Sequence, residues 1–165
     1  MSKIKIAVRA ARHEDFADVA RLIGDLVRLT HGWDGDFRPH PLGFTAAMFA
    51  SRLATPDRLY IVATRQDAIA GYASASLERH QGSDWMFPRT DVWVGVLVVD
   101  ASARRQGVGR ALFARIEEWA AAHHAEAINL TVIANNRPAR AFYRAMGYEP
   151  TVETRRKRLR LDAAR

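Results

Sequence analysis

Apolar and polar positions alternate at the start of the chain and then change to a helical period. Residues 4–8 alternate, which predicts a strand. Over residues 13–30 apolar side chains recur every three or four positions, which predicts a helix with one buried face. We expect a second helix over about residues 42–54. The loop between the two helices, residues 30–41, carries Trp33, Asp34, Asp36 and Phe37.

The middle of the chain contains apolar, β-branched runs that are typical of strands. Residues 59–65 and 69–77 predict a hairpin that turns at Gln66-Asp67. Residues 80–90 are expected to form a loop with Trp85, Met86 and Phe87. A fourth strand is predicted over residues 91–99, where the apolar character is strongest.

The second half returns to alternating helical and extended patterns. A helix is predicted over residues 107–123, a strand over 127–133 and a helix over 136–146, and two short strands are expected at the end. The expected order is therefore βααβββαβαββ. Because no linker-like or repeated segment interrupts it, we expect a single domain over residues 1–165.

Composition narrows the class of protein. The 165 residues contain no cysteine, which excludes disulfides, thiolate metal sites and a cysteine nucleophile. The longest apolar stretch, residues 92–99, is far too short to span a membrane, and the N-terminal sequence lacks the apolar core of a signal peptide. We therefore expect a cytoplasmic protein without a membrane partner. The histidines show no recognised ligand spacing, so no metal is expected.

The segment that follows the fourth expected strand is the most informative in the chain. The apolar run stops at Asp100, and a polar link leads to Arg104-Arg105-Gln106-Gly107-Val108-Gly109-Arg110 at the start of the next helix. A turn between a strand and a helix N-terminus leaves several backbone N–H groups unpaired, in the positive field of the helix dipole. Gly107 and Gly109 let a ligand approach the backbone closely, and the arginines supply charge. These features predict a pyrophosphate site.

Three known kinds of phosphate-binding turn differ in spacing. A Walker-type loop requires Gly-x-x-x-x-Gly-Lys-Ser/Thr, which does not occur here. A dinucleotide-binding turn requires a third glycine where this chain has Leu112. The pattern Gln/Arg-x-x-Gly-x-Gly/Ala is met in full by Arg104, Gly107 and Gly109. This segment resembles the coenzyme A pyrophosphate loop of the GNAT N-acetyltransferase superfamily.

A second segment is similar to another signature of the same superfamily. The pattern Asn-x-x-Ala-x-x-Phe/Leu-Tyr-x-x-x-Gly-Phe/Tyr is met at every constrained position from Asn136 to Tyr148. Asn136 is suited to cap a helix and Gly147 to end it in a left-handed conformation. Asn136 and Tyr143 are two helical turns apart and therefore share one face.

The resemblance implies a fold and a cofactor site. The fold is α/β (α+β), with a mixed central sheet of about seven strands flanked by four helices, and with strands four and five splayed apart. Acetyl-CoA is expected as cosubstrate in the gap between those strands, where a main-chain N–H near Val99 would polarise the thioester. The residues that the resemblance assigns to the cofactor are Leu97, Val98, Val99, Arg104, Arg105, Gln106, Gly107, Val108, Gly109, Arg110 and Asn136.

The implied reaction is direct transfer of an acetyl group to a primary amine, since a cysteine acetyl-enzyme is impossible. Tyr143 is expected to protonate the leaving thiolate, because a phenol with an ordinary pKa of about 10 keeps its proton at neutral pH. The general base stays open. Relatives place a glutamate at the positions of Gly95 or Thr131, and both are absent here. Asp91, Glu78 and ordered water are the alternatives.

The acceptor amine is not identified by the sequence. Trp33, Glu78, Asp91 and Trp93 are the candidate substrate contacts, and a small-molecule amine is favoured over a protein N-terminus or lysine. Two other readings stay open: a non-catalytic domain that senses acetyl-CoA, and a nucleic-acid-binding module based on the net charge of +7 and the basic run at residues 155–160. A solvated strand edge explains that run better. A homodimer is possible in this family.

Overall fold

The central element of the chain is one mixed sheet. The structure is a computed structural model and describes residues 5–38, 40 and 43–157. The chain divides into two compact units, Met1–Ile133 and Ala134–Arg165. The sheet lies in the first unit and has the strand order β1-β2-β3-β4-β5, with β4 and β5 parallel and all other neighbours antiparallel. The strands are β1 (Ile6–Ala10), β2 (Arg58–Arg65), β3 (Ala68–His80), β4 (Arg89–Val99) and β5 (Ala127–Leu130).

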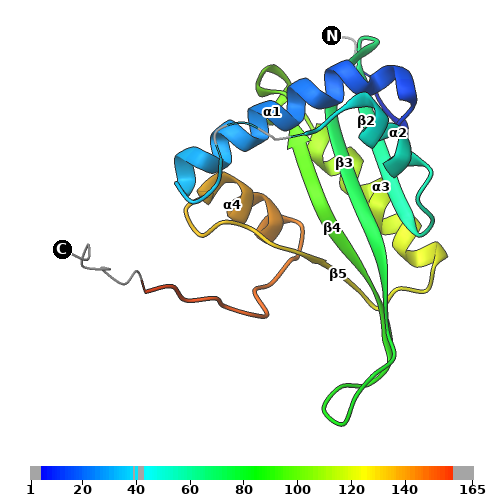
Figure 1. The fold of residues 1–165 in the computed structure, drawn as a ribbon, viewed down its shortest axis with the longest axis vertical. Coiled ribbons are helices and arrows are strands. Elements are labelled where there is room, and N and C mark those ends of the chain that lie inside the picture. The colour runs from blue at the N-terminus through cyan, green and yellow to red at the C-terminus, as the bar shows by residue number, and fades with distance from the viewer. Residues whose placement is uncertain (1–4, 39, 41–42, 158–165) are drawn as a thin grey trace. The chain divides into compact units, whose positions relative to one another are not determined.

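Helices cover both faces of the sheet (Figure 1). A short 3-10 turn, His13–Asp15, leads into α1 (Phe16–Trp33), and α2 (Ala46–Leu53) lies on the same face. A second 3-10 turn, Ala101–Ala103, precedes α3 (Val108–Ala122), which covers the opposite face. The second unit contains α4 (Arg137–Ala145).

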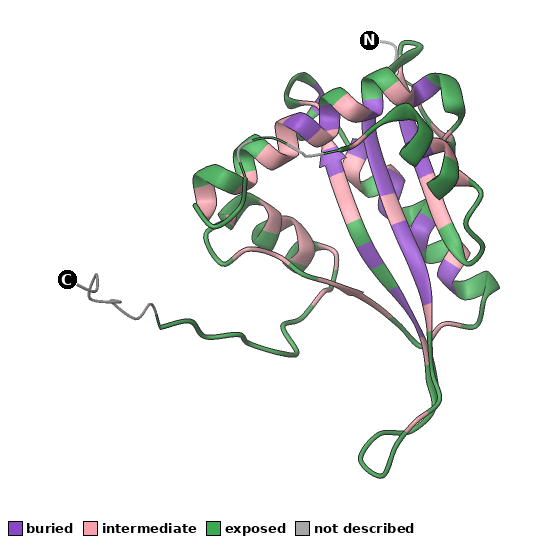
Figure 2. Ribbon diagram, in the orientation of Figure 1, coloured by how far each residue is buried: buried purple, intermediate pink, exposed green. Residues whose placement is uncertain are grey.

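The alternation of β3 explains the two layers of the core. Tyr72 packs in one cluster with Val19 and Leu22 of α1 and Phe49 of α2. The adjacent residue, Gly71, points to the other face, where α3 packs. The buried positions accordingly follow the strands and the inner sides of the helices (Figure 2).

A β-bulge interrupts β4. Ser74 of β3 pairs with Val96 and Ala75 pairs with Val94, so Gly95 is the extra residue on β4. A bulge bends its strand and increases the local twist. The pairing between β4 and β5 stops at the same place, with Val94 opposite Leu130. From there β4 continues to Val99 without a β5 partner, which confirms that the fourth and fifth strands part.

The expected seven-stranded sheet is wrong, because the described chain contains five strands. Residues 149–157 form neither of the two final strands that the sequence predicted. Pro150 has no N–H for a ladder, and the adjacent charges of Arg155, Arg156 and Lys157 favour exposure. The rest of the basic run, residues 158–160, lies outside the described residues.

The remaining differences concern boundaries. The fifth strand ends at Leu130 instead of residue 133, because the bulge turns β4 away. Trp33 is the last residue of α1 and not part of a loop, since the helix continues until Asp34 takes an extended conformation and donates its N–H to the carbonyl of Thr30. The second helix begins at Ala46 after the Thr45 cap, and Leu42, its predicted start, lies outside the described residues.

Candidate active site

The last residues of β4 present backbone groups to the gap. Asp100 donates its N–H to the carbonyl of Ala70 at 2.9 Å. Hydrogen-bonded and non-bonded pairs alternate in an antiparallel ladder. Counting back along the register, Val98 bonds to β3, whereas Leu97 and Val99 turn their N–H and C=O groups to the other edge. Of the three residues expected to pair with the pantetheine arm, Leu97 and Val99 are therefore suited to do so, and Val98 fills the core with its side chain.

The turn after β4 is held by an aspartate. Asp100 accepts hydrogen bonds from the N–H and the hydroxyl of Ser102, at 3.0 and 2.7 Å. Its other oxygen lies 2.7 Å from Arg21 of α1. The Ser102 hydroxyl and then the Arg21 guanidinium lower the pKa of Asp100 to about 2. This carboxylate therefore connects the end of β4, the 3-10 turn and α1 into one support for the segment that follows.

The predicted pyrophosphate turn has the expected backbone geometry. Gly107 has φ of +89° and precedes α3 without a capping side chain. Arg105 is also left-handed, with φ of +59°. Among the described residues, no amide from 106 to 110 acts as a donor in the backbone hydrogen bonds of turns and caps. These amides are therefore available to an anion at the positive end of the α3 dipole.

The side chains of the turn divide into two groups. Arg105 and Arg110 are exposed, so their charges are available to a phosphate. Arg104 donates through Nε to the carbonyl of Val99 at 3.3 Å, and Gln106 donates to the carbonyl of Ser102 at 2.8 Å. These two bonds shape the turn. Because Arg104 occupies the carbonyl of Val99, the backbone N–H of Val99 is the group that remains for a ligand.

Val108 is a packing residue within this turn. It is 1% exposed, and a Cβ added to Gly71 would lie 2.9 Å from Val108 Cγ1. Only the backbone of Val108 can serve a ligand. The absence of a side chain at Gly71 thus lets the start of α3 sit directly on the sheet.

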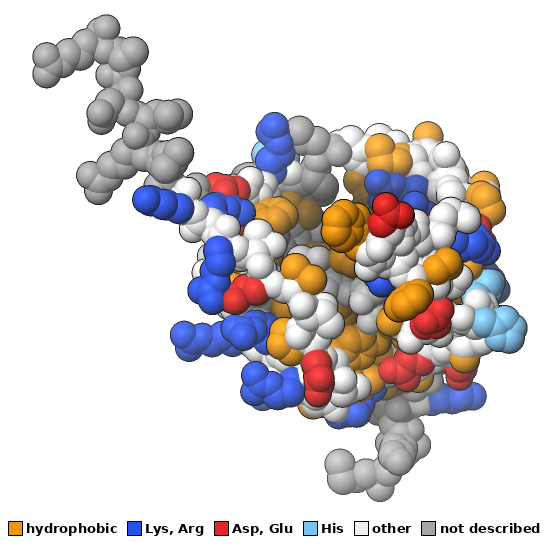
Figure 3. Space-filling view, turned by 90° about the horizontal axis from the view of Figure 1, so that it is seen from below, with side chains coloured by type: hydrophobic (Ala, Val, Ile, Leu, Met, Phe, Trp, Pro, Cys, Tyr) orange, Lys and Arg blue, Asp and Glu red, His pale blue; other side chains and the backbone are white. Residues whose placement is uncertain are grey.

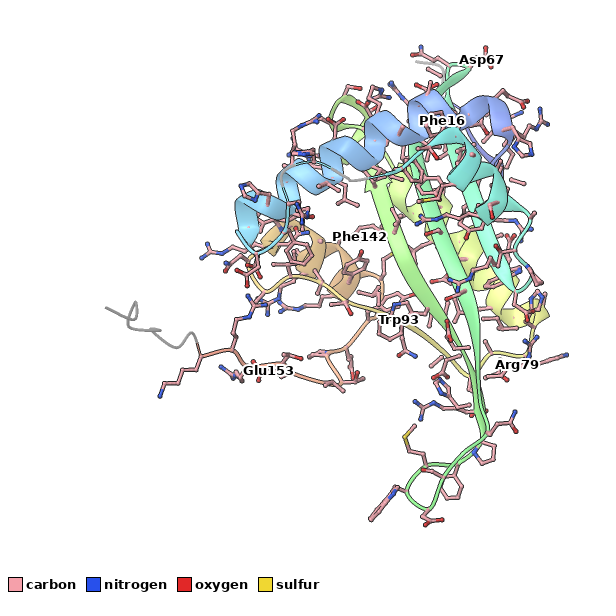
Figure 4. The ribbon with its side chains drawn as sticks, in the orientation of Figure 1. Phe16, Asp67, Arg79, Trp93, Phe142 and Glu153 are labelled. Carbon is pink, nitrogen blue, oxygen red and sulfur yellow. The ribbon has the colours of Figure 1, made fainter. Side chains whose placement is uncertain are left out.

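The face of the sheet that carries α1 and α2 has a small cavity of about 70 Å³ beside the bulge. Ser76 lies opposite Trp93 in the register, and Glu78 lies opposite Asp91. The Ser76 hydroxyl donates to Glu78 Oε1 at 2.7 Å. Trp93, labelled on β4 in Figure 4, is 43% exposed at the cavity. The lining residues are Arg58, Tyr60, Ser74, Ala75, Ser76, Trp93 and Gly95.

Asp91 is committed to the structure of the sheet. Its side chain is 4% exposed, and Oδ2 accepts from Arg89 at 2.7 Å and from Asn129 of β5 at 3.2 Å. His80 Nε2 lies 3.8 Å from the same oxygen. The other oxygen, Oδ1, is buried without a hydrogen-bond partner among the described residues. These contacts join β4 to β5 where their pairing begins, so a role as general base is less favoured than the sequence alone allowed.

Trp33, the remaining predicted substrate contact, is not among the residues that line the cavity. Trp33 ends α1. Trp85 and Phe87 lie at the turn between β3 and β4 and are 91% and 90% exposed. Ser83 and Met86 close that turn with backbone bonds of 2.8 and 3.3 Å. Figure 3 shows hydrophobic side chains on the surface of the face seen from the side of this hairpin.

The second unit contains the other predicted site residues on one helix. The side-chain oxygen of Asn136 caps α4 by accepting from the N–H of Ala139 at 3.1 Å, which leaves its amide N–H groups as donors. Tyr143 is partly buried, and its ring lies 6.0 Å from that of Tyr148. Burial raises the pKa of the Tyr143 phenol, so it keeps its proton. Gly147, with φ of +87°, ends the helix as predicted.

Several contacts of this site were not predicted from the sequence. The bulge had a signal, because an isolated glycine inside a strand pattern often marks one, and Gly95 is such a glycine. The pair of Ser76 and Glu78 also had a signal, since residues two apart on a strand share a face. The contact between Arg21 and Asp100 had none, because 79 positions separate them in the chain.

Residues 26–148 match the family model described as Acetyltransferase (GNAT) family. The chain belongs to the GNAT acetyltransferase family. Proteins of this family use acetyl-CoA, which agrees with the amide-rich turn and the parted strands described above. The fold expectation is thus confirmed as a GNAT-like α/β fold, apart from the number of strands.

Individual proteins of known sequence or structure are also similar to this chain. A Mycobacterium leprae protein named as uncharacterised is 33% identical over 117 residues; the match covers 71% of this GNAT chain but only 29% of that protein's length. The mutant F44R of the BH1408 protein from Bacillus halodurans has a TM-score of 0.88 and 27% identity, covering 93% of this chain and 99% of the other. A complex of AAC(6′)-Iy with the bisubstrate analogue CoA-S-monomethyl-acetylneamine has a TM-score of 0.73 at 20% identity, covering 94% and 99%.

Membrane-spanning helices and metal-ligand clusters are both absent from the described part of the chain. No helix in these residues is long and apolar enough to cross a membrane. The same residues contain no group of three or more His, Cys, Asp or Glu side chains arranged to hold a metal ion.

Proposed function

We propose that this GNAT protein transfers the acetyl group of acetyl-CoA directly to a primary amine of a small molecule. One observation carries the proposal: β4 has no β5 partner after Val94, continues to Val99 and leads into a turn rich in available amides. An extended pantetheine arm needs strand-like backbone partners, and a pyrophosphate needs converging N–H donors. Both occur here in consecutive segments.

The backbone of β4 would activate the thioester. A backbone N–H near Val99 is the donor proposed to polarise the carbonyl, since the ladder turns the N–H groups of Leu97 and Val99 toward the gap. A fixed backbone donor costs no reorganisation during the reaction. Because the chain has no cysteine, the amine attacks this carbonyl without an acetyl-cysteine intermediate.

Tyr143 is the proposed acid for the leaving group. Its phenol would transfer its proton to the coenzyme A thiolate as the tetrahedral intermediate breaks down. The raised pKa of the buried phenol supports this role, because Tyr143 then stays protonated over the whole neutral and mildly alkaline range. Asn136 on the same face of α4 is proposed to donate to the arm of the cofactor.

The cavity supports a small acceptor. Its volume of about 70 Å³ suits the amine end of a small molecule, with Trp93 and Tyr60 as an aromatic wall. A cationic amine is attracted to aromatic faces. The complex of AAC(6′)-Iy, a protein of the same fold, holds an analogue that joins coenzyme A to an acetylated aminoglycoside fragment. We extend only the class of acceptor, a small-molecule amine, to this chain.

Release of free thiol from acetyl-CoA tests the proposal. The purified protein is mixed with acetyl-CoA and, in turn, with polyamines, aminoglycosides, amino acids and peptides that carry a free N-terminus or a lysine. Amine-dependent thiol release with a small molecule supports the proposal. Release with the peptides alone assigns a protein acceptor. Binding of acetyl-CoA without release for any amine indicates a sensor and refutes transferase activity.

A further inference from the structure

Ser76 of β3 presents an oxygen that can only accept a hydrogen bond. Its side chain is buried, and its hydroxyl proton points to Glu78 Oε1 at 2.7 Å. A serine hydroxyl has one donor and two acceptor lone pairs. With the donor used, the lone pairs of Oγ remain, and Ser76 lines the cavity. Such an oxygen matches an N–H group and not a carbonyl or a carboxylate.

The position of Ser76 relates it to the missing general base. Ser76 lies opposite Trp93 in the ladder between β3 and β4. Gly95, at the bulge, is the next residue of β4 on the same face of the sheet as Trp93. Gly95 is the position at which the family resemblance leads one to expect a glutamate. Ser76 and Gly95 line the same cavity. Ser76, which is bonded to Glu78, therefore lies beside the β4 position that has no carboxylate.

We propose that Ser76 and Glu78 together remove the proton of the acceptor's ammonium group. This inference rests on the proposed function. The ammonium N–H bond breaks and its proton passes to Ser76 Oγ, while the Ser76 O–H proton passes to Glu78 Oε1. The freed lone pair of the amine attacks the thioester carbonyl, which the gap-facing N–H of Leu97 would polarise, because Leu97 lies three positions along the ladder from Ser76 and Val99 lies five. Glu78 later releases its proton to water, and Ser76 regains its starting state. Ser76 is the group that touches the acceptor, and Glu78 acts through it.

Charged groups surround this pair on both neighbouring strands. Arg58 of β2 lies opposite Ser76, and Asp91 of β4 lies opposite Glu78. Asp91 is itself held by Arg89, with His80 at 3.8 Å. None of these groups is itself substituted in the variants below.

Glu78→Gln tests the relay with little change in packing. The glutamine oxygen still accepts the Ser76 hydrogen bond, but it does not take up a proton at neutral pH. Turnover with the best amine of the panel is measured from pH 6.5 to 10.5, together with kcat and KM. We expect kcat/KM at pH 7 to fall at least about tenfold, because general base catalysis contributes at least that much. The deficit should shrink toward high pH, where an alkylamine with a pKa of about 10 is deprotonated by water.

Two further variants distinguish a proton relay from a structural role. Ser76→Ala should give the same deficit and the same pH dependence, and the double variant should be no worse than either single one. Glu117→Gln, the same chemical change on the exposed side of α3, serves as the control and should match the wild type at every pH. Coenzyme A binding and thermal unfolding check that each variant is folded.

The outcomes separate the two proposals. An active wild type whose Glu78→Gln variant shows the same rate, or a deficit that is constant with pH, overturns the relay and leaves the proposed function intact. A variant that folds poorly but has normal pH dependence in its remaining activity also overturns it. A wild type that binds acetyl-CoA but acetylates no amine overturns both.

Discussion

Replacing Gly71 with alanine tests how closely α3 must pack on the sheet. The new Cβ would lie 2.9 Å from Val108 Cγ1, 3.1 Å from Leu112 Cδ1 and 3.1 Å from the carbonyl oxygen of Val98. Non-bonded carbon atoms prefer about 3.5–4.0 Å. The start of α3 must therefore move away from β3 by roughly 0.6 Å or more.

The size of the expected loss in stability follows from the tight packing around Gly71. Val108 and Leu112 are 1% and 0% exposed, and the oxygen of Val98 belongs to the backbone, so no flexible side chain can give way. Overpacking of this kind costs about 1–3 kcal/mol. Alanine recovers about 0.5–1 kcal/mol of backbone entropy in the strand. Taking the middle of both ranges, the net loss in unfolding free energy should be about 1.3 kcal/mol, or roughly 3–5 °C in Tm for a chain of this size.

Gly24→Ala is the matched control. The chemical change is the same, but the added Cβ would meet only Arg28 Nη1 at an ordinary 3.5 Å, in the middle of α1. Helix propensity then predicts a gain of about 0.5–1 kcal/mol. Both variants are measured by urea unfolding at 25 °C. If Gly71→Ala is as stable as the wild type, α3 does not need the close contact with β3 at position 71.

Three further predictions concern the site. Tyr143→Phe should keep coenzyme A binding and lower turnover at least about tenfold, measured by thiol release; unchanged turnover removes Tyr143 from the mechanism. Arg110→Gln should weaken coenzyme A binding about three- to tenfold and reduce its salt dependence, measured by calorimetry at two ionic strengths, whereas equal affinity would exclude this charge from the site. Asp100→Asn should destabilise the protein by about 1 kcal/mol above pH 4, a discounted value because Arg21 is half exposed. Because the pKa of Asp100 falls from 3.8 to about 2 on folding, this difference should disappear between pH 4 and pH 2; a difference independent of pH would contradict it.

The elements with strong periodicity were predictable from the sequence. The three-to-four spacing of α1 and the long apolar runs of β3 and β4 were visible because apolar residues repeat wherever an element has a buried face. The hairpin at Gln66-Asp67 was also predictable, and both residues adopt positive φ as a tight turn requires. The turn at residues 104–110 was recognisable because its glycines stand at a fixed spacing, and its binding of a pyrophosphate stays a prediction.

Other features depended on register and on distant contacts. The bulge at Gly95 shifts the register between β3 and β4, and so decides which residues of the two strands lie opposite each other. No local sequence pattern fixes that register. The direction of Glu78 was open until the ladder placed it opposite Asp91 and Ser76 was seen to bond with it. The two final strands were expected because the family order contains them, but residues 149–157 lack the alternating apolar positions that would hold a strand on a sheet.

Calorimetric titration with two acetyl donors measures directly whether the turn at residues 106–110 holds the pyrophosphate of acetyl-CoA. Acetyl-CoA carries the pyrophosphate that the amides of residues 106–110 are proposed to hold, whereas acetyl-pantetheine carries only the arm that pairs with Leu97 and Val99. We expect one acetyl-CoA site per chain and at least about 100-fold weaker binding of acetyl-pantetheine, since several charge-assisted hydrogen bonds are lost. A folded protein that gives no heat with acetyl-CoA, or that binds both donors equally, would contradict it.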